Sequence, residues 1–341
     1  MSTSHEKLDT DLDWPAFIDA LPKGEHHLHL EGATPWARMR ETDPERFTVP
    51  PDSWADEFRF DDFGVFETLV LDYVVPWLNT PERYGLTARE IVAARRMENV
   101  QYLEVSIAGV AIEALGLDFA EVAAAIKQAV PPDFDLRLFV GLHHTGFERH
   151  EALLADILAC QDIDGIDLHG PEDYPLAGWL PEYWSAARAA GKRTKAHAGE
   201  LAGAFAVREA IEGLGVEKVQ HGIRAIEDPD VVALAVERGV SFDVCPISNV
   251  KLKAVPELAA HPLMRLDAAG VVCTLNTDDP FIFGNRLRDD YLAAATVLGA
   301  TPADLARFAK HSLVTADLPA PRREALCTEV DTVLQRFTSD A

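Results

Sequence analysis

Short apolar segments alternate with amphipathic segments along most of this chain, and this alternation limits the possible folds more than any other feature. Apolar runs bounded by turn residues are typical of buried strands, whereas apolar residues three or four apart are typical of helices. Strands that alternate with helices form parallel sheets, and eight such units predict a (β/α)8 TIM-type barrel. The predicted strands are residues 25–30, 100–107, 135–142, 165–168, 194–197, 216–221, 241–245 and 271–276.

Helices are predicted between the strands, and two segments fall outside the alternation. Residues 36–98 contain no strand pattern, and they predict a helical insertion that lies as a lid over one mouth of the barrel. Residues 302–341 predict extra C-terminal helices, so that residues 1–341 form a single domain. The predicted helices are residues 14–20, 87–97, 119–129, 149–160, 180–190, 204–212, 229–237, 262–269 and 289–300.

Two local features leave alternatives open. The aromatic residues from Trp54 to Phe66 lie at helical spacing, which predicts either ordinary core packing or an apolar lid over a pocket. Thr87 is expected to cap the helix 87–97. An open doubly wound sheet is the rival architecture, but it normally carries a Gly-x-Gly-x-x-Gly turn after its first strand. Here residues 31–35 read Glu-Gly-Ala-Thr-Pro instead.

The charge and the cysteines restrict the partners and the compartment. There are 56 acidic and 31 basic residues, which gives a formal net charge of −25. Such a chain repels nucleic acid and anionic membranes, so neither is an expected partner. The polar, acidic start predicts no secretory signal, and no apolar run reaches the length of a membrane span. Four scattered cysteines predict buried, reduced thiols in a cytoplasmic protein. The sequence does not indicate an oligomeric state.

Two histidines in the first predicted strand suggest a metal site. His27 and His29 are two residues apart, and on a strand such residues point to the same face. Both imidazoles could then bind one ion, while His26 points to the opposite face. A chance His-x-His pair on a surface strand is the alternative, and further ligands at other strand ends would decide between the two.

The ends of three later strands supply such residues. The carboxyl ends of barrel strands carry the active site in this fold. His197 and Glu200 follow the fifth predicted strand, His221 ends the sixth, and Asp278 and Asp279 follow the eighth. Three histidines and one aspartate form a ligand set that suits zinc. Each residue also has an ordinary structural explanation, such as a core histidine, a turn aspartate or a glutamate at a helix start. Their convergence on one rim favours a metal site.

The chain resembles the adenosine and adenine deaminase family of zinc-dependent amidohydrolases. The resemblance covers residues 21–285 and rests on motifs in the family's order. These are residues 21–32 (Leu-Pro-Lys-Gly-Glu-His-His-Leu-His-Leu-Glu-Gly), 197–200 (His-Ala-Gly-Glu), 221–222 (His-Gly), 245–249 (Cys-Pro-Ile-Ser-Asn) and 276–280 (Asn-Thr-Asp-Asp-Pro).

The resemblance implies a site and a reaction. His27, His29, His197 and Asp278 would bind one Zn2+ per chain, which acidifies a water that attacks C6 of a 6-aminopurine. His221 would orient that nucleophile, and Glu200, kept protonated by burial, would give a proton to purine N1. Among substrate-binding residues, Asp279 would contact N7, the backbone N–H of Gly170 would contact N3, and Glu31 stands where adenosine deaminases place an aspartate that meets the ribose. The fourth strand end has no lysine that could bridge a second metal, so a single ion is expected.

The substrate is left between several candidates. The first prediction is a zinc-dependent deaminase of adenosine or a close nucleoside relative. Adenine as the free base, which Glu31 favours, and 6-aminodeoxyfutalosine are the alternatives. A purine-binding scaffold barrel is the non-enzyme alternative, and a metal-dependent amidase or esterase is a third class. Ser106, where relatives usually carry arginine, and the pair His143 and His144 depart from the family pattern. The histidines are either a neutral packing pair or contacts to an unusual substrate group.

Overall fold

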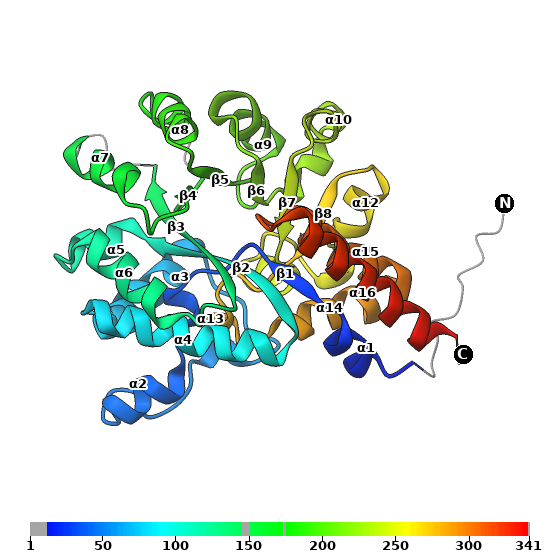
Figure 1. Ribbon diagram of the computed structural model, residues 1–341, viewed down its shortest axis with the longest axis horizontal. Helices are drawn as coiled ribbons and strands as arrows, with labels where there is room; N and C mark the ends of the chain where they lie inside the picture. The colour runs from blue at the N-terminus through cyan, green and yellow to red at the C-terminus, as the bar shows by residue number, and fades with distance from the viewer. Residues whose placement is uncertain (1–11, 145–150, 173–174, 340–341) are drawn as a thin grey trace.

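The computed structural model describes residues 12–144, 151–172 and 175–339. Eight parallel strands follow one another around the sheet in chain order, with helices on the outside (Figure 1). The (β/α)8 barrel predicted from the alternation is therefore confirmed. The strands are β1 Lys23–Glu25, β2 Val100–Ala108, β3 Asp135–His143, β4 Gly165–His169, β5 Arg193–Ala198, β6 Lys218–His221, β7 Ser241–Val244 and β8 Val272–Leu275.

The first strand is shorter than the predicted residues 25–30, and that prediction was wrong in extent. Regular pairing with β2 ends at Glu25, after a register shift between Lys23 and Gly24. The next two backbone N–H groups, of His26 and His27, donate to the side chain of Asn276 at 2.7 and 3.2 Å rather than to a neighbouring strand. Pairing resumes only as isolated bridges at Leu28 and His29.

These isolated bridges also close the barrel. The N–H of His29 donates to the carbonyl of Asp278 at 2.9 Å, and the N–H of Asp278 donates to the carbonyl of His27 at 3.1 Å. On the other side, Leu28 and Leu30 exchange backbone hydrogen bonds with Ser106 of β2. The segment after β1 therefore lies between β2 and the end of β8, which places His27 and His29 next to Asp278.

The helices largely follow the prediction, with three differences. Thr87 does not cap a helix: α4 begins at Pro81, its N-cap is Thr80, and Thr87 is buried inside it. The predicted helix 149–160 is described from Glu151, and its first two residues lie outside the described part. Two helices continue as π-helical turns, Val70–Val74 and Ala210–Leu214. The helices are α1 Trp14–Ala20, α2 Trp36–Thr42, α3 Phe63–Leu69, α4 Pro81–Met97, α5 Gly109–Ala114, α6 Phe119–Ala129, α7 Glu151–Ala159, α8 Leu180–Ala189, α9 Ala204–Glu209, α10 Pro229–Arg238, α11 Pro246–Lys251, α12 Leu263–Ala268, α13 Pro280–Phe283, α14 Leu287–Thr296, α15 Pro302–Val314 and α16 Ala320–Thr338.

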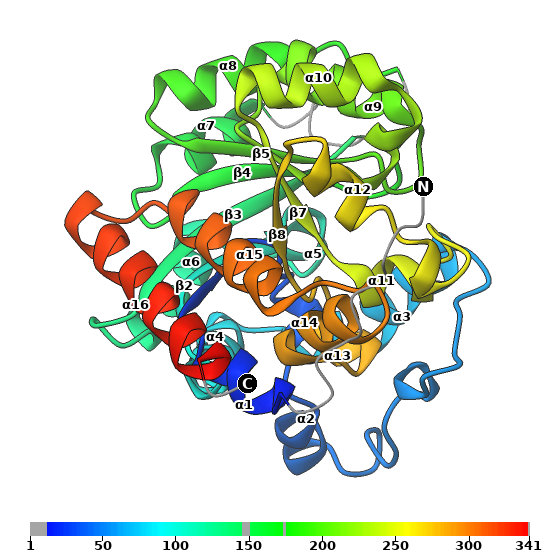
Figure 2. The ribbon, with the colours of Figure 1, turned by 90° about the vertical axis from the view of Figure 1, so that its right-hand side faces the viewer.

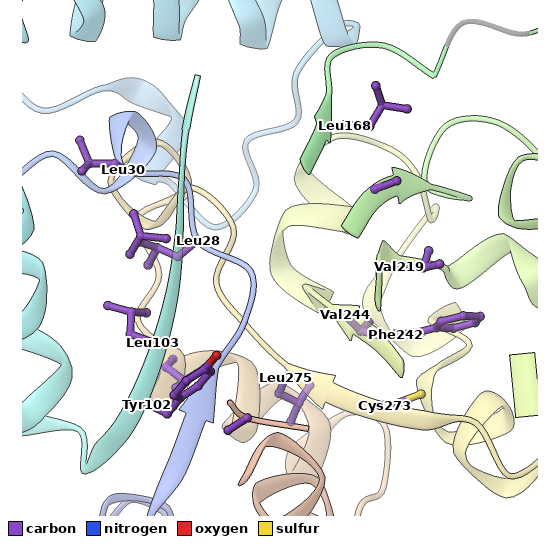
Figure 3. Close-up of a cluster of buried hydrophobic side chains, with 14 of the residues drawn as sticks. Leu28, Leu30, Tyr102, Leu103, Leu168, Val219, Phe242, Val244, Cys273 and Leu275 are labelled. Carbon is purple, nitrogen blue, oxygen red and sulfur yellow. The ribbon is translucent and has the colours of Figure 1, made fainter. Parts of the chain in front are cut away.

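Apolar side chains of the strands form one continuous core. Figure 3 shows Leu103, Phe242 and Leu275 of three strands in the same cluster as Leu28 and Leu30. Burial of such side chains contributes roughly 1.5–3 kcal/mol each. Two of the four free cysteines, Cys245 and Cys273, are buried as predicted, whereas Cys160 and Cys327 are only partly buried.

The barrel also buries charged side chains that contact one another. Glu104 of β2 accepts hydrogen bonds from Lys218 of β6 and from the hydroxyl of Tyr102. Lys195 of β5 lies 3.8 Å from Glu104 and donates to the backbone carbonyl of His26 at 2.9 Å. A buried charge without a partner is costly, so breaking any of these contacts would destabilise the fold. The contacts join β2, β5 and β6 to the segment that carries His27.

The last two helices lie against the barrel beside its first helix. Figure 2 shows α15 in front of β8. Helix α16 runs alongside α15, and α1 lies near the C-terminal end of α16. The N–H of Gly24 donates to the hydroxyl of Ser312 on α15 at 2.7 Å, so α15 covers the seam between β1 and β8. Within the described residues, no helix is both long and apolar enough to span a membrane.

Candidate metal centre and active site

Four side chains predicted as metal ligands converge at one rim of the barrel. The Nε2 atom of His197 lies 3.0 Å from Nε2 of His27 and 3.2 Å from Nε2 of His29. Oδ1 of Asp278 lies 3.1 Å from Nε2 of His27 and 3.2 Å from Nε2 of His29. The ligand atoms of residues far apart in the sequence thus surround a single point.

The geometry of these four atoms suits a tetrahedral ion. Ligands at the usual zinc distances of about 2.0–2.1 Å stand about 3.4 Å apart at the corners of a tetrahedron, close to the observed separations. Imidazole nitrogens in such close contact repel one another unless a proton or a cation lies between them. The donor set and its spacing therefore fit a divalent ion such as zinc.

Other groups fix the orientation of three of the four proposed ligands. Nδ1 of His27 contacts the backbone carbonyl of Asp243 at 3.1 Å, and Nδ1 of His197 contacts that of Leu168 at 2.8 Å. Each Nδ1 therefore carries the proton, and Nε2 is left free for a metal. The hydroxyl of Ser248 donates to Oδ2 of Asp278 at 2.6 Å, which leaves Oδ1 directed at the histidines.

Replacing Ser248 by alanine is expected to weaken zinc binding by about 10–100-fold, because the carboxylate of Asp278 loses the hydrogen bond that orients it. Competition with a chromophoric chelator measures the affinity. Ser185→Ala, at an exposed position of α8, is the matched control and should leave the affinity unchanged. Equal affinity in the Ser248 variant and the wild type would contradict the orienting role.

Glu200 and His221 lie immediately beside the four ligands. Nε2 of His221 is 3.3 Å from Oε2 of Glu200 and 3.9 Å from Oδ2 of Asp278. The side-chain amide of Asn249 donates to Oε1 of Glu200 at 3.0 Å and contacts Nδ1 of His221 at 3.0 Å. Glu200 is buried, so the alternative of a solvated helix start does not hold. His221 also has ligand atoms within 4.8 Å of His27, His197 and Asp278.

His221 and Asp278 both adopt a left-handed backbone conformation, with φ of 64° and 67°. This conformation is uncommon for residues other than glycine and costs free energy. It turns each chain sharply at the strand end, which directs both side chains into the site.

The two central carboxyl groups differ in their electrostatics. Burial, together with the nearby Asp278 and Glu172, raises the pKa of Glu200 well above its usual range. Burial acts in the same sense on Asp278, but His27 and His29 outweigh it and hold the pKa of Asp278 well below its usual range. One carboxyl group is therefore poised to hold a proton while its neighbour stays ionised, which is the arrangement that acid–base catalysis needs.

The three predicted substrate-binding residues all line the same pocket. Its volume is about 110 Å³, and it also contains His29, His197, Glu200, His221 and Asp278. Burial and the adjacent Asp278 raise the pKa of Asp279 well above its usual range. Glu31 accepts hydrogen bonds from the N–H of Ala108 at 3.0 Å and the hydroxyl of Tyr84 at 3.4 Å. Gly170 has φ of 88°, and a side chain there would collide with His143.

The pocket also settles the alternatives that were left open for the aromatic segment and for His143. Phe63, Phe66, Val70 and Leu71 of α3 and its continuation form an apolar wall, so the aromatic segment both packs in the core and faces the pocket. His143 lines the pocket, whereas His144 is buried and is not among the lining residues.

Two further features of the pocket concern β2 and β4. The hydroxyl of Ser106 donates to Asp167 at 3.1 Å, so this departure from the family pattern serves a contact below the site. His169 and Glu172 also line the pocket. His169 is the last residue of β4 and Glu172 follows it, and only their position at a strand end could have drawn attention to them.

The sequence matches known proteins over nearly its whole length. The family model described as adenosine deaminase matches residues 22–333. An aminodeoxyfutalosine deaminase of Streptomyces coelicolor is 32% identical over 338 residues, covering 95% of this chain and 87% of the relative. An adenine deaminase of Sinorhizobium fredii is 32% identical over 317 residues, covering 90% of this chain and 97% of the relative.

Solved structures agree with this assignment of the fold. The adenine deaminase of Arthrobacter aurescens superposes with a TM-score of 0.80 at 28% identity, over 92% of this chain and 99% of its own. An amidohydrolase of Burkholderia ambifaria, solved with bound zinc, superposes with a TM-score of 0.83 at 24% identity, over 95% of this chain and 94% of its own.

Proposed function

The chain belongs to the adenosine deaminase family, and from this premise we propose that it hydrolyses the exocyclic amino group of a 6-aminopurine to the 6-oxopurine and ammonia. Deaminases of this superfamily depend on a metal. The observation that supports the proposal most strongly is the convergence of four ligand atoms beside Glu200 and His221, at a pocket that all of these residues except His27 line. One zinc ion per chain, held by His27, His29, His197 and Asp278, is part of the proposal.

A bound zinc ion supplies an acidified water as the nucleophile. The protein performs the remaining steps. Glu200 donates its proton to N1 of the purine, which weakens the aromatic character of the ring and opens C6 to attack. His221, held by Asn249 and next to Glu200, orients the nucleophile and stabilises the charge that develops on its oxygen. Asp279, protonated by its surroundings, donates to N7, and the N–H of Gly170 donates to N3.

A nucleoside such as adenosine is the proposed substrate, with the free base adenine as second candidate. Glu31 favours the second candidate, because burial raises its pKa to about 7 and a carboxyl group that retains its proton can pair with a ring nitrogen. 6-Aminodeoxyfutalosine is a third candidate. The Streptomyces coelicolor relative that is named for that activity is as identical to this chain as the Sinorhizobium fredii adenine deaminase.

Ammonia release from purified protein loaded with zinc tests the proposal. The panel is adenosine, deoxyadenosine, 5′-methylthioadenosine, adenine and aminodeoxyfutalosine. Adenosine is expected to give the highest kcat/KM. A higher value for adenine would reject the nucleoside in favour of the base, and no ammonia from any purine would reject the deaminase and leave the scaffold or amidase alternatives.

Three coarser features complete the proposal. We take residues 1–341 as a single domain, with residues 36–98 as a lid that contributes the apolar wall of the pocket and residues 302–341 as C-terminal helices. The cytoplasm is the proposed compartment, and the four free cysteines support it. Small purines, rather than nucleic acid or membrane, are the proposed partners.

A further inference from the structure

A glutamate outside the predicted site holds the backbone that carries Glu200. Glu172 lies in the segment after β4, 28 residues before Glu200. Its Oε1 atom accepts the N–H of Glu200 at 2.9 Å, and its Oε2 atom accepts the N–H of Leu201 at 3.1 Å and also that of Ala202. One carboxylate therefore binds three successive backbone N–H groups.

Three converging N–H groups form an anion-binding concavity, and a carboxylate is a strong partner for it. Without that partner, the N–H groups would face the pocket unsatisfied, and a buried donor without an acceptor destabilises the conformation that holds it. A neutral amide at position 172 cannot replace the carboxylate fully, because glutamine has one acceptor oxygen and its NH2 group would meet N–H donors.

The opposite face of the same loop is held independently. The N–H of Arg224 donates to the carbonyl of Gly199 at 2.8 Å, and the guanidinium of Arg224 donates to the carbonyl of Leu201 at 2.5 Å. Gly199 itself has φ of 74°, and a side chain there would collide with Val207 of α9. Glu172 is thus the anchor on the pocket side of a loop whose other side is already fixed.

We propose that Glu172 is a positioning residue, which sets the backbone of residues 200–202 so that the carboxyl group of Glu200 reaches the reacting purine. This inference rests on the proposed function, because Glu200 must act as the acid for its position to matter. A displacement of about 1 Å in a reacting group can cost about 10²-fold in rate.

Glu172→Gln tests the inference by kinetics. We expect kcat to fall by about 10–100-fold with a much smaller change in KM and with one equivalent of zinc retained, because the proposed zinc ligands and the residues Glu31, Gly170 and Asp279 are unchanged. Glu172→Asp keeps the charge but shortens the reach, and it should lie between Glu172→Gln and the wild type. The charge-matched control is Glu237→Gln on the exposed side of α10. A fall of similar size in the control, or an unchanged kcat in Glu172→Gln, overturns the inference.

Amide hydrogen exchange gives a readout that does not depend on activity. In the wild type, the amides of residues 200–202 should exchange slowly despite lying in a loop, and in Glu172→Gln they should lose most of this protection while the strands keep theirs. Rapid exchange of these amides in the wild type overturns the inference, even if the variant does not fold. If the wild type releases no ammonia, the proposed function fails, and the exchange measurement still shows whether Glu172 holds the loop.

Discussion

Replacing Glu200 by glutamine is expected to lower kcat for the best purine by about 10²–10⁴-fold. The amide keeps the shape of the side chain and a partner for Asn249, but it cannot give a proton to N1. His27, His29, His197 and Asp278 are unchanged, so the variant should still hold one equivalent of zinc. Steady-state ammonia release and metal analysis on the same sample measure the two quantities.

The pH dependence of the wild type should report the same group. Glu200 acts in its protonated form, and its pKa is raised by burial and by Asp278 and Glu172. The protonated fraction, and with it kcat/KM, is therefore lost as the pH rises through that raised pKa. The alkaline limb should disappear from the residual activity of Glu200→Gln.

Near-normal turnover in this variant would remove Glu200 from the mechanism, whereas loss of zinc would show a structural defect instead.

The fold could be predicted because each strand is short, apolar and separated from the next by an amphipathic helix. Buried parallel strands produce that pattern directly. The first strand was predicted too long because Leu28 and Leu30 alternate with histidines, as buried and polar side chains do along a strand. The structure shows that Asn276, 250 residues away, takes the backbone N–H groups of His26 and His27. A long-range hydrogen bond of this kind leaves no local mark in the sequence. Thr87 was misassigned for a different reason, because Thr80 followed by Pro81 is a local signal of an earlier helix start that the prediction overlooked.

The ligands could be predicted because chemically distinctive residues stood at strand ends, where this fold gathers side chains. The residues that orient them could not be predicted in the same way. Ser248 and Glu172 are ordinary polar residues, and their roles follow from a 2.6 Å contact with Asp278 and from three backbone N–H groups. Ser248 stands in the motif 245–249, but the motif does not say what its hydroxyl contacts, and Glu172 lies outside every motif, so only the folded geometry reveals these contacts.

Removing the metal is expected to abolish turnover and to lower the thermal stability. A ligand that binds only the folded state stabilises it by about 2.7 kcal/mol when its concentration is 100 times its dissociation constant. In the metal-free protein, only protons can offset the repulsion among the His27, His29 and His197 nitrogens around Asp278. Dialysis against a chelator, followed by calorimetry and an ammonia assay before and after zinc is restored, measures both effects.

A single ligand substitution separates the metal from the fold. His197→Gln should hold less than stoichiometric zinc and lose activity that added zinc does not restore. His311→Gln, which replaces a partly buried histidine on α15 whose Nδ1 contacts the carbonyl of Cys273, should keep both zinc and activity. His197 is the sharpest choice, since its Nε2 lies within 3.2 Å of the Nε2 atoms of both other histidine ligands. If the chelated protein kept its turnover, the four side chains would be a buried polar cluster rather than a metal centre. Water activation would then have to come from the remaining acid–base pair of Glu200 and His221 alone.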